Sequence, residues 1–192
     1  PLQPAIPARV LSIYPNAAQI CGPIQGGARN PVIEQQIQNF NRVMNLSQTG
    51  RDLIGTAARY DSNPAWMCFE NIKGLHAVYY IGKGVITVGM NKTNDEIVSD
   101  SAHELRHLFQ EKARGADIEP RDREDSVHLE YVDEADAEAT SSLVLWELKQ
   151  AGHAGPWNSH NSPYSYGPRS ICYAHISTAF KQAVDGGATL PE

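Results

Sequence analysis

The chain lacks the features that mark a membrane-spanning or nucleic-acid-binding protein. Among its 192 residues no apolar run approaches the roughly 20 residues that a transmembrane helix needs. Basic residues are the minority, with 16 Lys and Arg against 22 Asp and Glu, and the formal net charge is −6. This balance leaves no basic footprint for nucleic acid or an anionic membrane surface. The residues given also show no basic and apolar signal segment.

Cysteine is scarce as well. The three cysteines, Cys21, Cys68 and Cys172, lie far apart and form no C-x-x-C pair, which argues against a zinc ribbon. An odd number of cysteines most simply predicts buried or free thiols in a reducing compartment. One disulfide with one free thiol is the alternative.

Proline and glycine are concentrated at one end of the chain. Residues 1–30 carry five prolines and three glycines, and this composition predicts an irregular N-terminal arm. Residues 31–192 follow as a single predicted domain. With 41% hydrophobic residues, a chain of this length can bury a sizeable core.

The most informative pattern that is present is the H-E-x-x-H motif of His103, Glu104 and His107. Two histidines at positions i and i+4 of a helix lie on one face and can reach a single metal ion. Glu104 is close enough to take a proton from a water molecule at that metal. Peptide hydrolysis needs this combination, so the motif predicts a zinc hydrolase.

The surrounding sequence supports a helix at this motif. Thr93 and Glu96 form a capping box at its start, and Gly115 stands where a C-terminal cap belongs. Apolar residues recur at helical spacing between them, and Leu105 points about 200° away from His103. We therefore expect one side of the helix to pack and the histidine side to face a cleft. An exposed polar helix without metal is the alternative interpretation.

Catalytic zinc needs a third protein ligand, with water in the fourth position. A second long helical pattern begins at Glu130 and runs to Gly152. Small residues at 135, 137 and 139 would let this helix approach the first one closely, and Glu134 is the preferred ligand. Glu130 and Glu138 lie one turn to either side and are its rivals, whereas Asp136 points away. Acidic residues at a helix start are also favoured by the helix dipole without any ligand role.

The two motifs also resemble those of a known protein family. Residues 102–110 and 133–139 resemble a bacterial family of metallopeptidases, and they are similar to gluzincin peptidases, in which a glutamate on a following helix completes H-E-x-x-H. Residues 47–54 are similar to an element of that family and of effector metallopeptidases of the NleD-like kind. The resemblance spans about residues 47–152. It implies zinc bound by His103, His107 and Glu134, with Glu104 as the base, in a soluble bacterial protein that is secreted or injected and cuts a host or competitor protein.

The remaining elements are readable in outline. Pro31 opens a helix with an apolar face, a second helix covers residues 48–60, and a last one covers residues 171–184. Strands at residues 75–81 and 85–90 are separated by Gly82-Lys83-Gly84, which predicts a hairpin. In zincin folds a strand edge lines the cleft, and residues 85–88 could supply it, although an ordinary core hairpin is equally consistent.

Charged residues 116–128 are expected to form a solvated connection, and residues 153–170 a non-helical loop. Many metallopeptidases stabilise the oxyanion with a Tyr, His or Arg. This loop is the best source of such a group, and its candidates are His160, Tyr164, Tyr166 and Arg169.

The sequence thus predicts an α+β fold of zincin type, with a small sheet or hairpin packed on the H-E-x-x-H helix and a following ligand helix. The predicted activity is that of a zinc-dependent endopeptidase on a protein or peptide. Two other classes stay open. One is a zinc-binding interaction module without turnover, and the other is a zinc amidase acting on a small or cell-wall substrate in a closed pocket.

Overall fold

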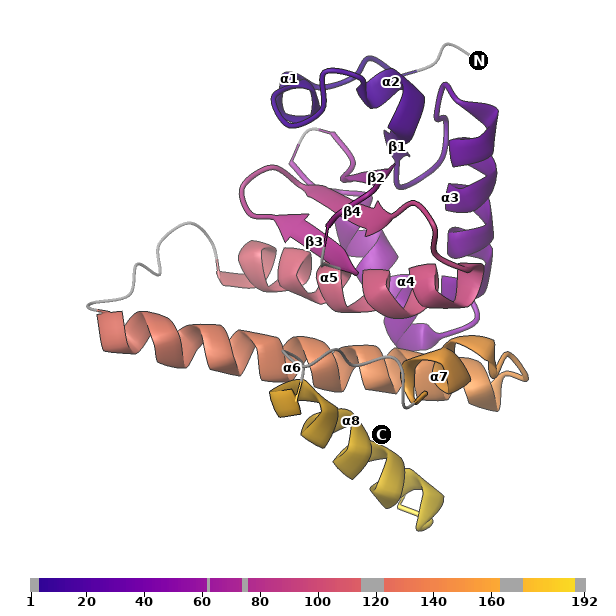
Figure 1. Ribbon diagram of the computed structural model, residues 1–192, viewed down its shortest axis with the longest axis vertical. Helices are drawn as coiled ribbons and strands as arrows, with labels where there is room; N and C mark the ends of the chain where they lie inside the picture. The colour runs from indigo at the N-terminus through magenta and orange to yellow at the C-terminus, as the bar shows by residue number, and fades with distance from the viewer. Residues whose placement is uncertain (1–3, 62, 74–75, 115–122, 163–170, 189–192) are drawn as a thin grey trace.

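The computed structural model describes residues 4–61, 63–73, 76–114, 123–162 and 171–188. Its fold is mixed α and β, as the sequence predicts (Figure 1). The elements are, in chain order, α1 (Ala8–Leu11), α2 (Ala17–Ile20), β1 (Cys21–Pro23), α3 (Pro31–Met44), α4 (Gln48–Ala57), β2 (Trp66–Glu70), β3 (Ala77–Tyr80), β4 (Val85–Gly89), α5 (Asn94–Arg114), α6 (Arg123–Gln150), α7 (Gly155–His160) and α8 (Ile171–Asp185).

The sheet has four strands in the order β1-β2-β4-β3. The interior strands β2 and β4 run parallel, and β1 and β3 flank them antiparallel. The predicted hairpin is therefore present as β3 and β4, but β2 was missed. Both faces of an interior parallel strand are covered, so β2 is one buried apolar run, Trp66 to Phe69, without the alternation that predicts a strand.

The hairpin turn depends on its glycines. Gly82 and Gly84 have φ angles of +70° and +57°, in the region that favours glycine. A Cβ at Gly84 would also stand 2.4 Å from the ring of Tyr60. These two constraints fix where β3 turns back into β4.

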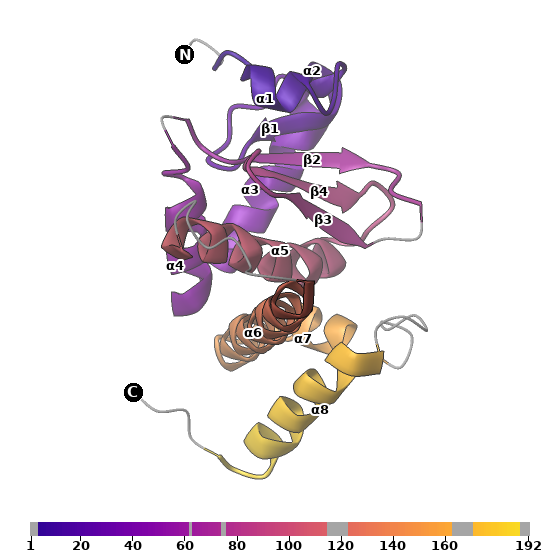
Figure 2. The same ribbon diagram turned by 90° about the vertical axis from the view of Figure 1, so that its left-hand side faces the viewer.

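Each face of the sheet carries its own core. Met67, Phe69, Ile86 and Val88 face the larger core, which α3, α4, α5 and α6 complete. The opposite face packs against the N-terminal segment. The buried residues of this second core come from α1, α2, the turn between them, β1, β2 and β4, namely Val10, Tyr14, Ala17, Ile20, Cys21, Trp66, Cys68 and Val85. In both ribbon views α1 and α2 lie at the end of the sheet remote from α5 (Figures 1 and 2).

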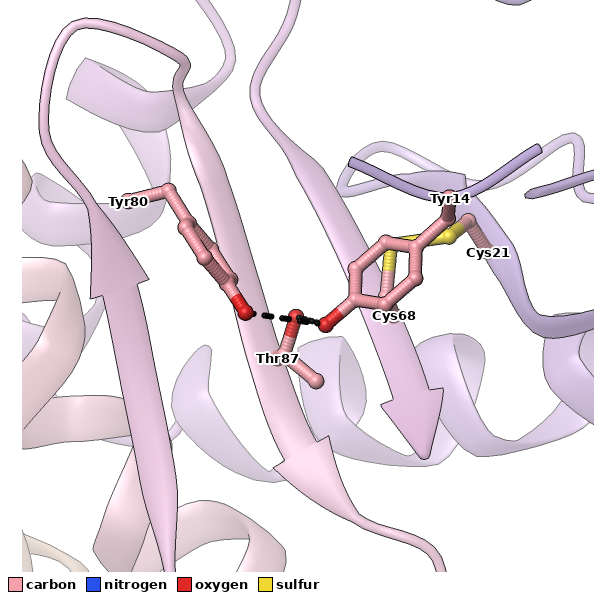
Figure 3. The surroundings of a disulfide bond; sticks show 5 residues. All are labelled: Tyr14, Cys21, Cys68, Tyr80 and Thr87. Atoms are coloured by element: carbon pink, nitrogen blue, oxygen red, sulfur yellow. Dashed lines mark hydrogen bonds between the residues drawn. A yellow bond between two sulfur atoms is a disulfide. The ribbon is translucent and has the colours of Figure 1, made fainter. Parts of the chain in front are cut away.

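The N-terminal segment differs from the irregular arm expected for residues 1–30. It contains α1, α2 and β1, and β1 pairs with β2 so that Cys21 lies opposite Cys68. These two cysteines form a disulfide, shown in Figure 3 beside Tyr14, whose hydroxyl lies 3.0 Å from Thr87 Oγ1 and 3.2 Å from the hydroxyl of Tyr80. The expectation of free thiols was therefore wrong for this pair, because strand pairing brings two distant cysteines together. The predicted single domain over residues 31–192 stays a prediction.

Helices α3 and α4 match the sequence prediction, and capping residues begin both. The side chain of Asn30 accepts from the backbone N–H of Val32, and that of Ser47 accepts from the backbone N–H of Gly50. The hydroxyls of Ser47 and Thr49 also donate to Glu147 of α6, at 2.5 and 2.9 Å. The motif at residues 47–54 thus anchors the start of α4 to the long helix α6.

The expected capping box is present at the start of α5. The backbone N–H of Thr93 donates to Glu96 at 2.8 Å, and the backbone N–H of Glu96 donates to Thr93 Oγ1 at 3.3 Å. Gly115, the predicted C-terminal cap, lies outside the described residues. Helix α6 begins at Arg123, earlier than the predicted Glu130.

The C-terminal part also differs from its prediction. Within residues 153–170, expected to be non-helical, the structure has the helix α7, which begins with Gly155 and Pro156. Pro in the first turn suits a helix start, but beside Gly it resembles a loop signal. In Figures 1 and 2, α6 lies below α5, and α8 lies below α6. No helix in the described ranges is both long and apolar enough to cross a membrane.

Candidate metal centre

Helix α5 brings the two histidines of the motif together. Its apolar side, with Ala102, Leu105 and Leu108 fully buried, packs into the main core and fixes the rotation of the helix. The opposite side then carries His103 and His107, whose side chains are 19% and 17% exposed. Their Nε2 atoms lie 3.1 Å apart.

Helix α6 supplies the third group. Glu134 places Oε2 3.2 Å from His103 Nε2 and Oε1 3.3 Å from His107 Nε2. Ala137 is fully buried, and its small side chain is consistent with the close packing of the two helices. Of the alanines expected to allow this approach, Ala135 is half-buried and Ala139 is exposed.

The three groups lie close enough together to hold one metal ion. Ligand atoms held about 2.0–2.1 Å from a zinc ion stand about 3.3–3.4 Å from one another at the corners of a tetrahedron. The nearest atoms of the three groups are separated by 3.1, 3.2 and 3.3 Å, with Glu134 facing each histidine through a different carboxylate oxygen. When each residue offers a single ligand atom, these atoms lie within 4.8 Å of one another. Two imidazoles and one carboxylate are also a donor set that zinc accepts. The residues present therefore fit the metal that the motif predicts.

The rival carboxylates occupy other positions. Glu130 is exposed, and Asp136 forms a two-pronged ion pair with Arg106, at 2.7 and 3.0 Å. Glu138 is only 4% exposed and reaches the other nitrogen of His103, with Oε2 3.5 Å from Nδ1.

Both histidines have a partner on the nitrogen that faces away from Glu134. Glu138 approaches His103 Nδ1, and Gln110 Oε1 lies 2.9 Å from His107 Nδ1. Gln110 is held in turn because its amide donates to the backbone oxygen of Asp133 and to Asp136. Such partners fix ring orientation and tautomer in metal sites. Sequence reasoning missed these roles, although Gln110 follows His107 by three positions and Glu138 follows Glu134 by four.

The charges of the cluster shift its pKa values. Burial alone would lower the pKa of His103, but the hydrogen bonds that its ring donates to Glu134 and Glu138, together with the charge of Glu104, raise it to about 10. Burial would raise the pKa of Glu134, but the two imidazoles lower it to about 2. The opposite shifts show that each charged group favours the charged form of the other.

Glu104 lies on a different side of α5 from the two imidazoles, facing β3. Burial raises the pKa of its carboxyl above the ordinary value, against the opposing charges of His103 and His107. A hydrogen bond from the backbone N–H of Tyr79 also reaches it. Glu104 is thus fixed between the strand and the histidines.

The strand that borders the site is β3, not β4. Residues 85–88 were a candidate for the cleft edge, with an ordinary core hairpin as the equal alternative. In the structure β4 lies inside the sheet, and β3 has no neighbour on its outer side among the described residues. His76 accepts from the backbone N–H of Gly89, so alternation along the ladder turns the backbone groups of Ala77 and Tyr79 outward. Helix α5 contacts β3, which Figure 2 shows between β4 and α5.

Glu111 fixes this strand on the helix. It accepts hydrogen bonds from the hydroxyls of Tyr60 and Tyr79, at 2.9 and 2.7 Å, and from the backbone N–H of Gly82 at 2.8 Å. The last of these groups belongs to the hairpin turn. The edge strand is therefore fixed to the same helix that carries the histidines.

Of the four candidates for an oxyanion-stabilising group, only His160 lies in the described part of the chain. Tyr164, Tyr166 and Arg169 lie outside the described residues. His160 is described, and its place contradicts the expectation. Its Nε2 lies 3.0 Å from Glu138 Oε1, so the ring is buried behind His103.

Comparison with known proteins agrees with this geometry. The profile of one family, described as "Putative metallopeptidase family (DUF6782)", matches residues 15–191. No curated protein and no solved structure is similar enough to this chain to match it.

Proposed function

Because the chain belongs to this metallopeptidase family, we propose that it is a zinc-dependent endopeptidase of gluzincin type. His103, His107 and Glu134 are the proposed ligands, and Glu104 is the proposed general base. The observation that carries this proposal is the convergence of the three donor groups, whose closest atoms are 3.1–3.3 Å apart. That convergence comes from two separate helices, and it agrees with a zinc site of two imidazoles and one carboxylate.

Zinc is the metal that this donor set favours. Mg²⁺ and Ca²⁺ prefer sites built entirely from oxygen, whereas two imidazoles with one carboxylate are found in zinc hydrolases. When bound, zinc supplies Lewis-acid chemistry, lowering the pKa of a water molecule and polarising a carbonyl. The outer partners Glu138 and Gln110 would keep the ring orientations that this site needs.

The residues of the chain supply the proton transfers. Glu104 takes a proton from the attacking water while the water oxygen bonds to the carbonyl carbon of the scissile peptide. The carbon–nitrogen bond then breaks, and the proton on Glu104 passes to the leaving amine. Burial raises the pKa of Glu104 above its ordinary value, which makes this carboxylate a stronger proton acceptor.

The edge of β3 favours an extended peptide as substrate. Ala77 presents its outward N–H and C=O groups beside α5, and a peptide can add to such an edge as another strand. The outward N–H of Tyr79 is used by Glu104, so the base lies at the same edge. This arrangement supports a peptidase over an amidase that encloses a small substrate.

A comparison of wild type with Glu104→Gln tests the proposal. The variant should keep its zinc and lose about 10²–10⁴-fold in rate, because it retains the three ligands but lacks a base. Newly formed termini would be identified by mass spectrometry in a lysate treated with each protein. A lysate of host or competitor cells would also test the proposed effector role.

The outcomes separate the candidate functions. Cleaved protein termini that depend on Glu104 support the peptidase. Zinc binding without cleavage of any protein or amide would instead favour an interaction module. Turnover of the variant near the wild-type rate would remove Glu104 from its proposed role.

A further inference from the structure

A buried polar network lies behind the metal centre, on the side of His103 away from Glu134. Glu138 is at its middle, with one oxygen toward His103 and the other toward the C-terminal helices. His160 of α7 places Nε2 3.0 Å from Glu138 Oε1, and Ser177 of α8 donates to the same oxygen. The network therefore brings side chains from α5, α6, α7 and α8 to one carboxylate.

The network extends further in both directions. His160 Nδ1 lies 3.0 Å from Ser99 Oγ on α5, and Ser142 of α6 donates to Ser177 Oγ at 3.3 Å. A carboxylate only accepts hydrogen bonds, so the contact with Glu138 needs the form of His160 that carries a proton on Nε2. Ser177 Oγ lies 2.9 Å from the same nitrogen. Both oxygens of Glu138 thus face groups that can donate hydrogen bonds.

Burial of a charged carboxylate costs desolvation free energy, so the presence of Glu138 at this position needs an explanation. Ser99, Glu138, Ser142 and Ser177 are each at most 4% exposed. Apolar residues of similar size often replace a buried ionic group without loss of stability, so a buried carboxylate is weak support for a purely stabilising role. Glu138 is oriented toward a proposed metal ligand, His103, which gives the network a function in the site.

We infer that His160 and Ser177 are positioning residues for the metal centre. By holding Glu138, they fix the ring of His103 with Nε2 toward the metal position, so the C-terminal helices α7 and α8 help to set the metal affinity. This inference rests on the proposed zinc site, and it assigns a function to a part of the chain that the H-E-x-x-H motif and the Glu134 helix do not include.

Zinc competition titrations of variants test the inference. His160→Leu removes the donor to Glu138 and should weaken zinc binding by about 10–100-fold, as is typical for partners of metal ligands. His160→Gln keeps an amide donor near the position of Nε2 and should recover much of that loss. Ser177→Ala removes a single hydroxyl with little change in volume and should weaken binding in the same direction.

Trp157→Phe is the matched control. Trp157 is also a buried side chain of α7, 3% exposed, and it packs on Phe180 of α8, 6.3 Å between ring centroids. Its substitution should lower the free energy of unfolding of the metal-free protein and leave zinc affinity unchanged. Visible absorption of the cobalt-substituted proteins provides a second readout, since it reports ligand geometry at the metal. It should change in His160→Leu and stay as in wild type in Trp157→Phe.

The outcomes are decisive in either direction. Zinc affinity and cobalt spectra of His160→Leu and Ser177→Ala equal to wild type would overturn the inference and leave the zinc site itself intact. Equal losses in Trp157→Phe and His160→Leu would also overturn it, because packing alone would then explain them. If His160→Leu does not fold, Ser177→Ala and His160→Gln decide the matter. Absence of zinc from wild type would instead reject the proposed function.

Discussion

Glu134 and Glu138 lie one turn apart on α6 and face different nitrogen atoms of the histidines. Glu134 faces the two Nε2 atoms, whereas Glu138 faces His103 Nδ1 from the other side. The sequence could place both on one face of a helix, but it could not say which one reaches the metal position. That depends on how α5 and α6 pack against each other.

Removal of Glu134 should therefore weaken zinc binding more than removal of any neighbouring carboxylate. We expect Glu134→Ala to lose far more than the roughly 10–100-fold typical of outer partners, and Glu138→Ala to lose about that amount. Glu130→Ala is the control, because Glu130 is exposed and lies on the same helix. Competition titrations of the three variants measure this order. A larger loss in Glu138→Ala than in Glu134→Ala would exchange the two roles.

At the scale of elements, the metal helix and the hairpin were predictable because their signals are local. A capping box, helical spacing and a glycine turn each act within a few residues, and all of them are present. Strand β2 and the pairing of β1 were not predictable, since their strand identity comes from partners distant in the chain. Likewise, only the pairing order reveals that β3, rather than β4, forms the edge beside the site.

The connection between β1 and α3 contains a pH-dependent contact. Glu34 of α3 accepts hydrogen bonds from the backbone N–H groups of Gly27 and Ala28, each 2.7 Å long, and from Gln38. Partial burial alone would raise the pKa of Glu34, but these hydrogen bonds lower it below the ordinary value. A lowered pKa in the folded state stabilises the protein above the unfolded pKa, and the stabilisation is lost as pH falls.

Glu34→Gln should accordingly be less stable than wild type at pH 7, and the difference should shrink as pH falls below about 4.5, where the unfolded carboxyl is protonated. Urea unfolding at pH 7 and at pH 3 measures both free energies of unfolding. Gln35→Glu adds an exposed carboxylate on the same helix as a control for net charge. A difference between wild type and Glu34→Gln that is the same at both pH values would contradict this explanation.

At the scale of the whole molecule, the N-terminal segment covers the face of the sheet opposite to the main core. The Cys21–Cys68 disulfide links two strands that are 47 positions apart, far from the proposed metal site. It should therefore contribute to stability and not to metal binding. Loop closure of this length predicts a contribution of about 2–4 kcal/mol to the free energy of unfolding.

The double variant Cys21→Ala/Cys68→Ala should lose stability of about this size and keep zinc affinity within about twofold of wild type. Denaturant unfolding and zinc titration of the same preparation test both parts. A large loss of zinc affinity in a folded double variant would show that the disulfide also supports the metal site. That result would contradict the prediction.

The central claim is that one zinc ion is held by side chains of α5 and α6. Elemental analysis of the purified protein, of His103→Ala and of His107→Ala tests it most directly. About one zinc per chain is expected in wild type, and most of it should be missing from each variant, since two remaining ligands hold catalytic zinc poorly. Full zinc content in both single variants, or no zinc in wild type after incubation with the metal, would contradict the claim.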